Sequence, residues 1–290
     1  MPRVSIAVPA YNCERYIAQS LESLLGQTYT DFELVISDNA STDGTEQLCR
    51  DFAAQDSRIR YVRRAENIGG PGNFRYVFSL CSGIYHKWST ADDYWDRTFL
   101  AKAVAELDSR PDVVLCYPKT RLINALGETI EDYDDNLDLQ EPSPRDRFRR
   151  LLASIRLCNA HLGLIRRDAM IRTHLIGPEL ASDVHFLAEL SLQGKFSLLP
   201  DRLFFRRYHE QSSSWNRTST EHQRKYYDPG GRKMGGFHTW KKHARLISSV
   251  WRAPVALQQK MLLSGDLARY LVWDSGQLTR ELTSATRSLV

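Results

Sequence analysis

Short apolar runs alternate with segments of helical length through the first 120 residues, and this alternation constrains the fold most strongly. The runs have the length and β-branched content of buried strands and occupy Val4–Val8, Phe32–Ser37, Ile59–Val62, Tyr85–Ser89 and Val113–Tyr117. The segments between them space apolar residues three or four positions apart and occupy Glu14–Leu25, Asp43–Ala54, Pro71–Cys81 and Arg97–Leu107. This alternation predicts βαβ units, so we expect an α/β fold with a mostly parallel central sheet flanked by helices.

The pattern changes after Tyr117. Seven acidic residues and few apolar ones lie in Gly127–Glu141, which predicts a loop. The pair Ser143-Pro144 is typical of a helix start and predicts a helix over Pro142–Ile155. We then expect a helix over Ser182–Leu192 and a strand from Phe196 to Tyr208. These elements predict a second half over residues 121–215, after a first half over residues 1–120.

Residues 216–290 carry the basic excess of the chain. They contain 13 Lys or Arg and 5 Asp or Glu residues, whereas the whole chain has a net charge of +4. The apolar spacing over Trp240–Leu282 predicts one or two amphipathic helices and so a basic, mainly helical C-terminal extension. Such helices can lie on anionic lipid surfaces, and the alternative is that they pack on the core with a solvated basic face. We expect no nucleic-acid binding, because no recognised module accompanies the charge.

Composition excludes several classes of protein. With 42% hydrophobic and 26% charged residues, the chain is neither disordered nor a small disulfide-bonded scaffold. Its five cysteines stand singly with no CxxC pair, which indicates a reducing compartment. The sequence begins without a signal-peptide pattern, and no run of apolar residues is long enough to span a membrane. We expect a cytoplasmic protein, with peripheral attachment to the inner face of a membrane left open.

Polar side chains follow three of the predicted strands. The first strand ends in Pro9-Ala10-Tyr11-Asn12, the second leads into Asp38–Thr45, and the fourth leads into Ala91-Asp92-Asp93. Because parallel sheets bind ligands beyond the carboxyl ends of their strands, we expect these segments to form one site. A carboxylate there can accept a hydrogen bond from a nucleoside, and neighbouring carboxylates suit a divalent cation that also binds phosphates. Taken singly, Asp38 could instead be a turn acceptor and the Asp pair a helix cap.

Together these motifs resemble the family 2 glycosyltransferases of the GT-A fold. The matching residues are Val4–Asn12, Ser23–Thr28, Phe32–Thr45, Asn67-Ile68-Gly69 with Asn73, and Thr90–Asp93. The resemblance covers at least residues 1–120 and extends more weakly to about 215. It implies a GT-A domain over residues 1–215 that uses a nucleotide-sugar donor, followed by the extension over 216–290.

The resemblance also implies roles for individual residues on the donor side. The residues expected around the nucleotide sugar are Pro9, Tyr11, Asn12, Asp38, Asn67, Asp92 and Arg206, with Asp38 facing the base. Asp93 is expected to be the direct ligand of Mn²⁺ or Mg²⁺, with Asp92 and His209 beside it. Because the motif is Ala-Asp-Asp, the division of roles between the two carboxylates stays open.

On the acceptor side, Ser182-Asp183 resembles the family's Glu-Asp pair, whose carboxylate is the general base of inverting members. Asp183 is therefore expected to deprotonate the acceptor hydroxyl in a single displacement. The structural alternative is an aspartate that caps a helix. His161 is a further residue that could border the acceptor pocket, although a lone histidine in an apolar segment is more often part of the core.

The sequence thus predicts a metal-dependent, inverting glycosyltransferase that acts on a glycan, glycolipid or other lipid-linked acceptor, as in polysaccharide biosynthesis. A sugar nucleotidyltransferase is one alternative, but it should have a glycine-rich basic loop where this chain has Pro9–Glu14. A non-catalytic nucleotide-sugar-binding scaffold is another. Such a protein should have lost the carboxylates of Asp93 or Asp183, and both are present.

Overall fold

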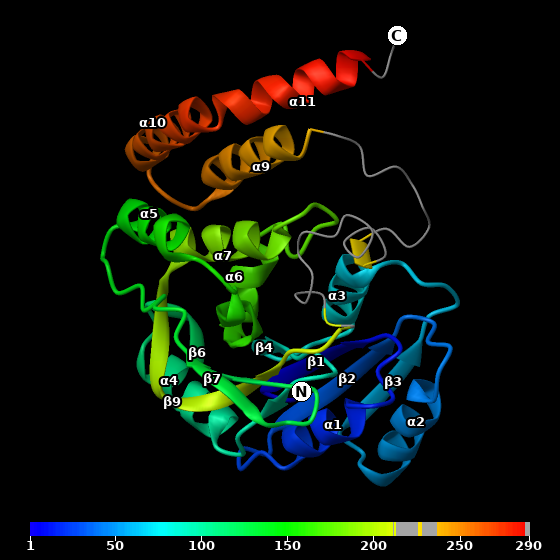
Figure 1. Ribbon diagram of the computed structural model, residues 1–290. Coiled ribbons are helices and arrows are strands. Elements are labelled where there is room, and N and C mark those ends of the chain that lie inside the picture. The colour runs from blue at the N-terminus through cyan, green and yellow to red at the C-terminus, as the bar shows by residue number, and fades with distance from the viewer. Residues whose placement is uncertain (211, 213–225, 228–236, 288–290) are drawn as a thin grey trace.

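A single curved sheet organises the chain, with helices on both of its faces (Figure 1). The computed structural model describes residues 1–210, 212, 226–227 and 237–287. In these residues the sheet follows the order β3-β2-β1-β4-β8-β6-β9-β5, and β7 pairs with β6. The strands are β1 (Val4–Ala10), β2 (Phe32–Asp38), β3 (Ile59–Arg63), β4 (Tyr85–Trp88), β5 (Tyr94–Trp95), β6 (Val113–Ile123), β7 (Thr129–Tyr133), β8 (Leu164–Arg166) and β9 (Lys195–Arg207).

Strand β1 lies between β2 and β4 and runs parallel to both. Its side chains Ile6 and Val8 are fully buried, as expected for a parallel strand covered on both faces. The register sets Ala10 beside Asp38, so β1 and β2 end at the same edge of the sheet. Ala7 pairs with Trp88, and the Ser89 N–H donates to the Ala7 carbonyl, which brings the segment after β4 to this edge too. The parallel pairings therefore gather the three polar segments.

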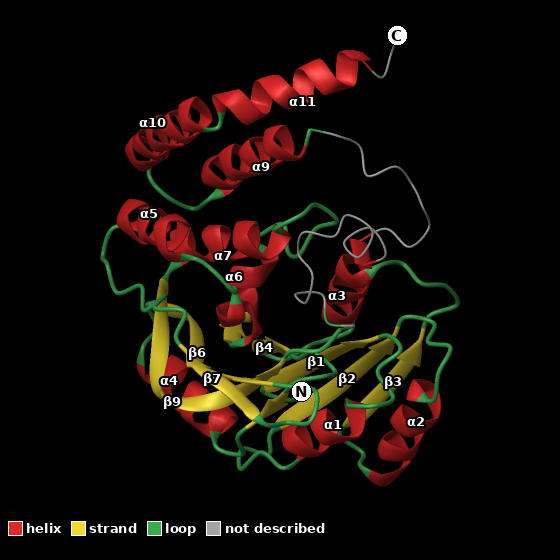
Figure 2. Ribbon diagram, viewed as in Figure 1, coloured by secondary structure: helices red, strands yellow, loops and turns green. Residues whose placement is uncertain are grey.

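Helices cover both faces of the sheet (Figure 2). On one face lie α1 (Ile17–Leu25), α2 (Thr45–Gln55) and α4 (Phe99–Ser109), and on the other α3 (Gly70–Ser79), α6 (Arg167–Ile171) and α7 (Ser182–Gln193). A short 3-10 helix, η1 (Asn159–Leu162), precedes β8. Helix α1 buries Ile17, Leu21 and Leu24, which recur at the spacing of one helix face. The α/β fold, the mostly parallel sheet and the flanking helices predicted from the sequence are confirmed.

Some boundaries differ from the sequence predictions. The acidic segment Gly127–Glu141 is not only a loop, because β7 within it pairs antiparallel with β6. Residues 129–132 are all exposed, so this edge strand lacks the apolar alternation that would have predicted it. Helix α1 begins at Ile17 rather than Glu14, because Glu14 instead contacts the loop after β2 through Asp43 and Gly44.

Three C-terminal helices follow where the sequence predicted one or two: α9 (His238–Arg252), α10 (Leu257–Trp273) and α11 (Ser275–Arg287). They form a layer over α7 and α5 (Pro144–Ser154), as Figure 1 shows. Helix α9 docks on α7 through a hydrogen bond of 2.6 Å from Ser249 Oγ to the buried Glu189 Oε1. Helix α10 docks on α5 through Arg145, whose guanidinium donates twice to Asp266, at 2.6 and 2.9 Å. The layer is thus attached to the α/β body by buried polar contacts.

Replacing Glu189 by Ala should lower the stability of the protein. Besides Ser249, the Glu189 carboxylate accepts a hydrogen bond from the His174 N–H at 2.6 Å, so its loss leaves buried donors without a partner. We expect the free energy of unfolding to fall by about 1–3 kcal/mol, measured by urea denaturation. The matched control is Glu131→Ala on the exposed strand β7, which should change it little. Equal stability of the two variants would contradict this account of the docking.

Candidate active site

Two adjoining pockets lie at the edge where β1, β2 and β4 end. The strand-end pocket has a volume of about 380 Å³ and is lined by Pro9, Tyr11, Asn12, Asn39, Asn67 and His209, among others. The helix-side pocket has a volume of about 350 Å³, and its lining includes Asp93, His161, Asp183 and Arg206. Both pockets are lined by Phe74, Thr90, Asp92, Ser212 and Tyr226. These shared residues form a common wall through which the two pockets adjoin.

The loop after β1 forms one side of the strand-end pocket. Asn12 has a φ of 46°, a left-handed conformation that asparagine tolerates better than most residues. Its Oδ1 accepts a hydrogen bond from the Thr42 N–H at 2.8 Å, and its own N–H donates to Ser41 Oγ at 3.0 Å. These contacts fix the loop and leave the neighbouring Tyr11 side chain 47% exposed at the pocket. Tyr11 can therefore offer its ring to a planar ligand.

Asp38 lies beneath the strand-end pocket and is not among the residues that line it. Its carboxylate is fully buried and accepts hydrogen bonds from the Ser41 N–H at 2.9 Å and from the Tyr61 hydroxyl at 2.8 Å. The arrangement differs from the expectation that Asp38 faces a nucleobase, because β3 supplies a partner that draws the carboxylate inward.

Two asparagines line the strand-end pocket near the position expected for Asp38, although Asn39 is itself almost fully buried. Asn39 Nδ2 donates to Asn67 Oδ1 at 2.8 Å, and both residues line the strand-end pocket. Asn39 Oδ1 accepts a hydrogen bond from the Ile68 N–H at 3.0 Å, which orients the amide. Asn67 was predicted from the sequence and Asn39 was missed, although its position directly after a strand-end aspartate was a usable signal. Such amides can hydrogen-bond the edge of a base or a sugar hydroxyl.

Asp92 lies in the common wall and contacts His209. The distance from Asp92 Oδ2 to His209 Nε2 is 2.9 Å, and the Asp92 side chain is 23% exposed. The His209 ring packs against Tyr16, with 4.8 Å between ring centroids. The structure therefore brings together an oxygen donor and a nitrogen donor from residues far apart in the sequence.

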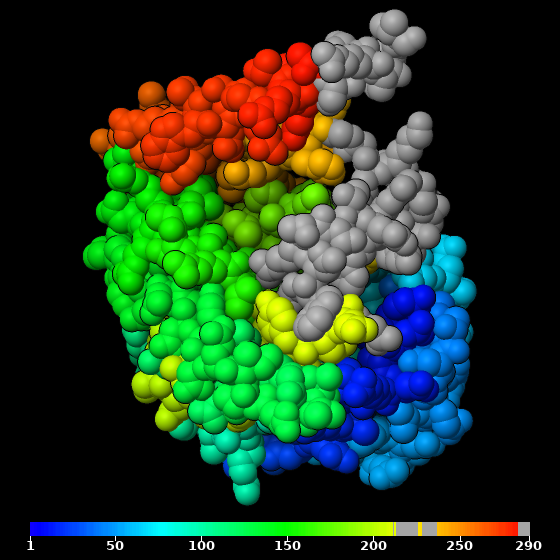
Figure 3. Space-filling view, viewed as in Figure 1, coloured from blue at the N-terminus to red at the C-terminus, as the bar shows by residue number. Residues whose placement is uncertain are grey.

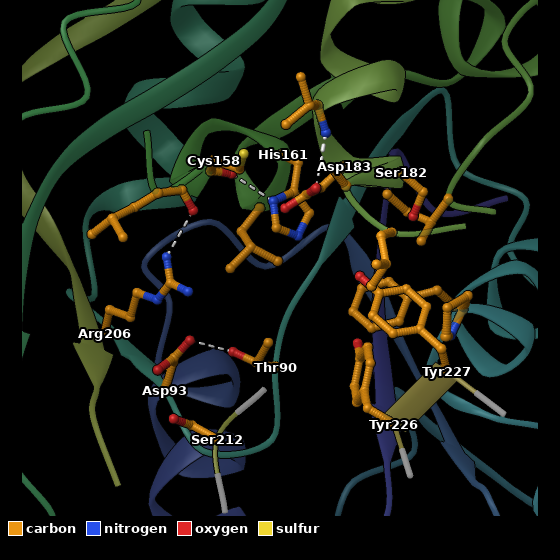
Figure 4. Close-up of a pocket in the computed structure, with 18 of the residues that line it drawn as sticks. Thr90, Asp93, Cys158, His161, Ser182, Asp183, Arg206, Ser212, Tyr226 and Tyr227 are labelled. Atoms are coloured by element: carbon orange, nitrogen blue, oxygen red, sulfur yellow. Dashed lines mark hydrogen bonds between the residues drawn. The ribbon is translucent and has the colours of Figure 1, made fainter. Parts of the chain in front are cut away.

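Asp93 is buried beside Asp92 and has both of its carboxylate oxygens engaged. Oδ1 accepts a hydrogen bond of 2.6 Å from the Arg207 N–H. Oδ2 contacts the Thr90 hydroxyl, as Figure 4 shows. Burial and the nearby charge of Asp92 raise the pKa of Asp93 to about 7. In this arrangement Asp92 is the more accessible carboxylate. Asp92 is therefore better placed than Asp93 to bind a metal ion directly.

Asp92 of the common wall and the neighbouring His209 fit a divalent cation that arrives with a phosphate ligand. Among the residues that the structure describes, no three His, Cys, Asp or Glu side chains gather into a complete metal centre. Asp92 and His209 supply two donors. Mg²⁺ typically keeps one or two carboxylates and takes its other ligands from phosphate oxygens and water. A pair of protein ligands is therefore sufficient for such an ion.

Two adjacent arginines at the end of β9 have different roles because alternate strand residues point to opposite faces. Arg206 lines the helix-side pocket, and its Nη1 donates to the Leu157 carbonyl at 2.9 Å and to the Asn159 side chain. Arg207, which sequence reasoning missed, also lines this pocket but is buried. Its Nε donates to the Asp92 carbonyl at 2.9 Å and its Nη1 to the Asn124 carbonyl at 3.1 Å. Arg207 thus holds the Asp92-Asp93 segment in place.

Asp183 lies on the opposite side of the helix-side pocket, in the first turn of α7 (Figure 4). Its Oδ1 accepts a hydrogen bond from the Val184 N–H at 2.9 Å. His161 lines the same pocket, and its Nδ1 lies 2.6 Å from the Cys158 carbonyl. That contact assigns the proton to Nδ1. Burial lowers the pKa of His161, whereas the charge of Asp183 opposes this shift. The pocket therefore combines a carboxylate with a buried imidazole.

Glu179 connects the segment before Asp183 to the C-terminal helix layer. Its Oε1 lies 3.3 Å from Arg245 Nε of α9 and 3.9 Å from His185 Nδ1 of α7. Burial by itself raises the pKa of Glu179, but interactions with His185 and Arg245 outweigh burial and lower the pKa to about 2. Helix α9 therefore helps to hold the segment that leads into Asp183.

The Glu179 carboxylate should make stability depend on acidic pH. Because its pKa falls from an ordinary value of 4.5 to about 2 on folding, its contribution is complete above about pH 4.5 and is lost as the pH falls toward 2. From about pH 6 to about pH 3, the wild type should lose roughly 2 kcal/mol more stability than Glu179→Gln. Urea denaturation at a series of pH values measures this difference. Parallel curves for the two proteins would contradict the pairing.

Comparison with known proteins identifies the family. The model described as Glycosyl transferase family 2 matches residues 5–172, more than half of the chain. The chain belongs to this family. An uncharacterized protein of Mycobacterium tuberculosis is 28% identical over 238 residues, which cover 80% of this chain and 65% of that protein. This chain thus spans just under two thirds of the length of that relative. A chondroitin synthase of Escherichia coli is 32% identical over 133 residues, which cover 46% of this chain and 19% of that protein.

Solved structures establish the fold of this family 2 chain. TarS of S. aureus, in complex with UDP-GlcNAc, has a TM-score of 0.66 at 18% identity, covering 93% of this chain and 73% of that chain. A mannosyltransferase of Pyrobaculum calidifontis, in complex with GDP-Man and Mn²⁺, has a TM-score of 0.57 at 19% identity, covering 98% and 86%. At such identities the similarity shows the fold alone. That fold is the GT-A fold expected from the sequence.

Proposed function

We propose that the protein is a metal-assisted, inverting glycosyltransferase that moves a hexosyl or related sugar from a nucleotide donor to an acceptor hydroxyl. The observation that carries this proposal is the pair of adjoining pockets, with Asp92 in their common wall and Asp183 in the helix-side pocket alone. Two substrates bound in these pockets would meet at the common wall. Family membership and the nucleotide sugars bound by structural neighbours support the same conclusion.

In this proposal the strand-end pocket binds the nucleoside of the donor. Tyr11 packs on the base, and the Asn67 amide, held by Asn39, hydrogen-bonds polar groups of the nucleoside. Pro9 and Asn12 shape the pocket, and Asp38 acts from beneath by fixing the loop at Ser41. The donor half then corresponds to residues 1–120, and His209 closes it from the end of β9.

Departure of the nucleoside diphosphate requires stabilisation of its growing negative charge. Asp92 and His209 would hold Mn²⁺ or Mg²⁺, which supplies that stabilisation when bound to the diphosphate. Asp93, hydrogen-bonded to the Arg207 N–H, orients this segment from below. Arg206 adds positive charge on the helix-side wall, where its guanidinium can contact phosphate oxygens.

The acceptor hydroxyl loses its proton to Asp183. A general base must lie on the face of the sugar opposite the leaving group for an inverting displacement. Asp183 lines the pocket beyond the common wall, on the far side from His209. His161, with Nδ1 directed to a backbone carbonyl, offers Nε2 to the acceptor or to a bridging water. The acceptor half corresponds to residues 121–215, and we propose a glycan or lipid-linked acceptor, with the enzyme at the cytoplasmic face of a membrane.

Asp183→Asn should slow transfer strongly without affecting donor binding. Loss of the general base should lower the turnover rate roughly 10²–10⁴-fold, measured as release of nucleoside diphosphate with acceptor present. A matched control is Asp168→Asn, because Asp168 Oδ1 also accepts a hydrogen bond from the next N–H, at 2.8 Å, and Asp168 lines neither pocket. Equal activity of both variants would exclude Asp183 as the base.

Asp92→Asn should weaken metal-dependent binding of the donor. Removing the accessible carboxylate reduces the charge that holds the cation, so we expect donor affinity in Mn²⁺ or Mg²⁺ to fall about tenfold or more. Calorimetry against UDP-, GDP- and dTDP-sugars, with and without the cation, measures this effect and identifies the nucleotide. Donor binding that is independent of metal in the wild type would contradict the metal-assisted mechanism. Normal binding without transfer by the wild type would favour the scaffold function.

A further inference from the structure

The outward face of α10 is apolar, although it lies at the surface. Leu257, Met261 and Val272 are 63%, 64% and 70% exposed. Together with Gly265 and Ala268 they recur every three or four residues and so occupy one side of the helix. The opposite side carries the buried residues Leu263, Asp266 and Leu267, which pack toward α5 and α9. An apolar face over a helix of this length is unusual in a protein surface and marks an interaction site.

Helix α9 extends the apolar surface. Trp240, Ile247 and Trp251 recur at spacings of seven and four residues and are 40%, 37% and 51% exposed. Lys260 Nζ donates to the Trp251 carbonyl at 2.7 Å, so the end of α9 lies beside the first turns of α10. Trp273, at the end of α10, is 76% exposed. Figure 3 shows α10 and α11 (orange to red) at the outer edge of the molecule.

The charge around this surface is basic. Residues 237–283 contain seven Lys or Arg and three acidic residues. Each of the three carboxylates has a partner: Asp266 pairs with Arg145 of α5, Asp274 with Lys242 and His243, and Glu281 accepts a hydrogen bond from the Thr239 N–H. In contrast, Arg252 and Arg269 are exposed, the latter with 75% of its side chain. The helix layer therefore presents apolar and mainly cationic groups to the outside, because its three carboxylates are each paired.

We infer that α9 and α10 dock the protein on an anionic lipid surface. Exposed Leu, Met and Val side chains would enter the acyl boundary, Trp rings suit the interface, and the Lys and Arg side chains would pair with lipid phosphates. A second copy of the chain fits less well, because a symmetric contact would place these basic residues opposite one another. Among the residues that the structure describes, no helix is long and apolar enough to cross a membrane.

Helix α9 links this surface to a segment that lines the helix-side pocket. Arg245 of this helix contacts Glu179, which directly precedes the lining residues Leu180 and Ala181. Docking would therefore bring the pocket close to the lipid headgroups. Only one part of this inference rests on the proposed function, namely the acceptor. If the protein is a glycosyltransferase, the inference specifies an acceptor that is carried on a lipid in the surface on which the helices lie.

The test is sedimentation of the full chain with vesicles of phosphatidylcholine, with or without phosphatidylglycerol. We expect binding to the mixed vesicles, weakened at high salt, and little binding to phosphatidylcholine alone. The double variant Met261→Asp/Val272→Asp should lower the affinity for mixed vesicles at least about tenfold. The matched control is Ile84→Asp, whose side chain is 59% exposed just before β4, outside the helix layer. It should bind as the wild type does.

The outcomes separate this inference from the proposed function. Donor binding measured by calorimetry should be the same in the double variant and the wild type, which also shows that the variant is folded. Failure of the wild type to bind mixed vesicles would overturn the inference, whatever its transferase activity. So would equal vesicle binding by the double variant. A concentration-dependent dimer without vesicles, lost in the double variant, would identify a second copy as the partner instead.

Discussion

The buried guanidinium of Arg207 holds together the parts of the molecule that form the site. Arg207 donates to the Asp92 carbonyl and to the β6–β7 turn at Asn124, and its N–H donates to Asp93. It also donates to Gln19 of α1 at 2.5 Å. Arginine can hydrogen-bond several carbonyls at once, because its planar guanidinium carries five N–H donors in a rigid arrangement. As a result, the end of β9 is held against the segment after β4. His209, which follows β9, therefore lies next to Asp92.

The two sides of the site are held in different ways. The strand-end pocket depends on parallel pairing of β1 with β2 and β4, where regular backbone hydrogen bonds set the register. The helix-side pocket depends on α7, which carries Asp183 at its start and the buried Glu189 further along. Because Glu189 and Glu179 both contact α9, the C-terminal layer helps to position the proposed base.

Much of the fold could be predicted because local pattern and tertiary structure agree in it. The buried runs of β1 and β2, the amphipathic α1 and the Ser143 cap of α5 all follow from residues close in sequence. Strand β7 could not be predicted, because an exposed edge strand needs no apolar alternation. The burial of the Asp38 carboxylate could not be predicted either, because it also depends on pairing between strands. Its partner Tyr61 lies on β3, and only strand pairing brings the two together.

By itself, the sequence determined the order of strands and helices and the set of polar residues at the strand ends, since hydrophobic periodicity and turn chemistry are local properties. The tertiary structure alone decided which of those residues reach the pockets. It buried Asp93 and left Asp92 accessible, placed Asn39 and Asn67 where Asp38 was expected, and turned the apolar faces of α9 and α10 outward. These outcomes depend on contacts between residues far apart in the chain, which no local pattern encodes.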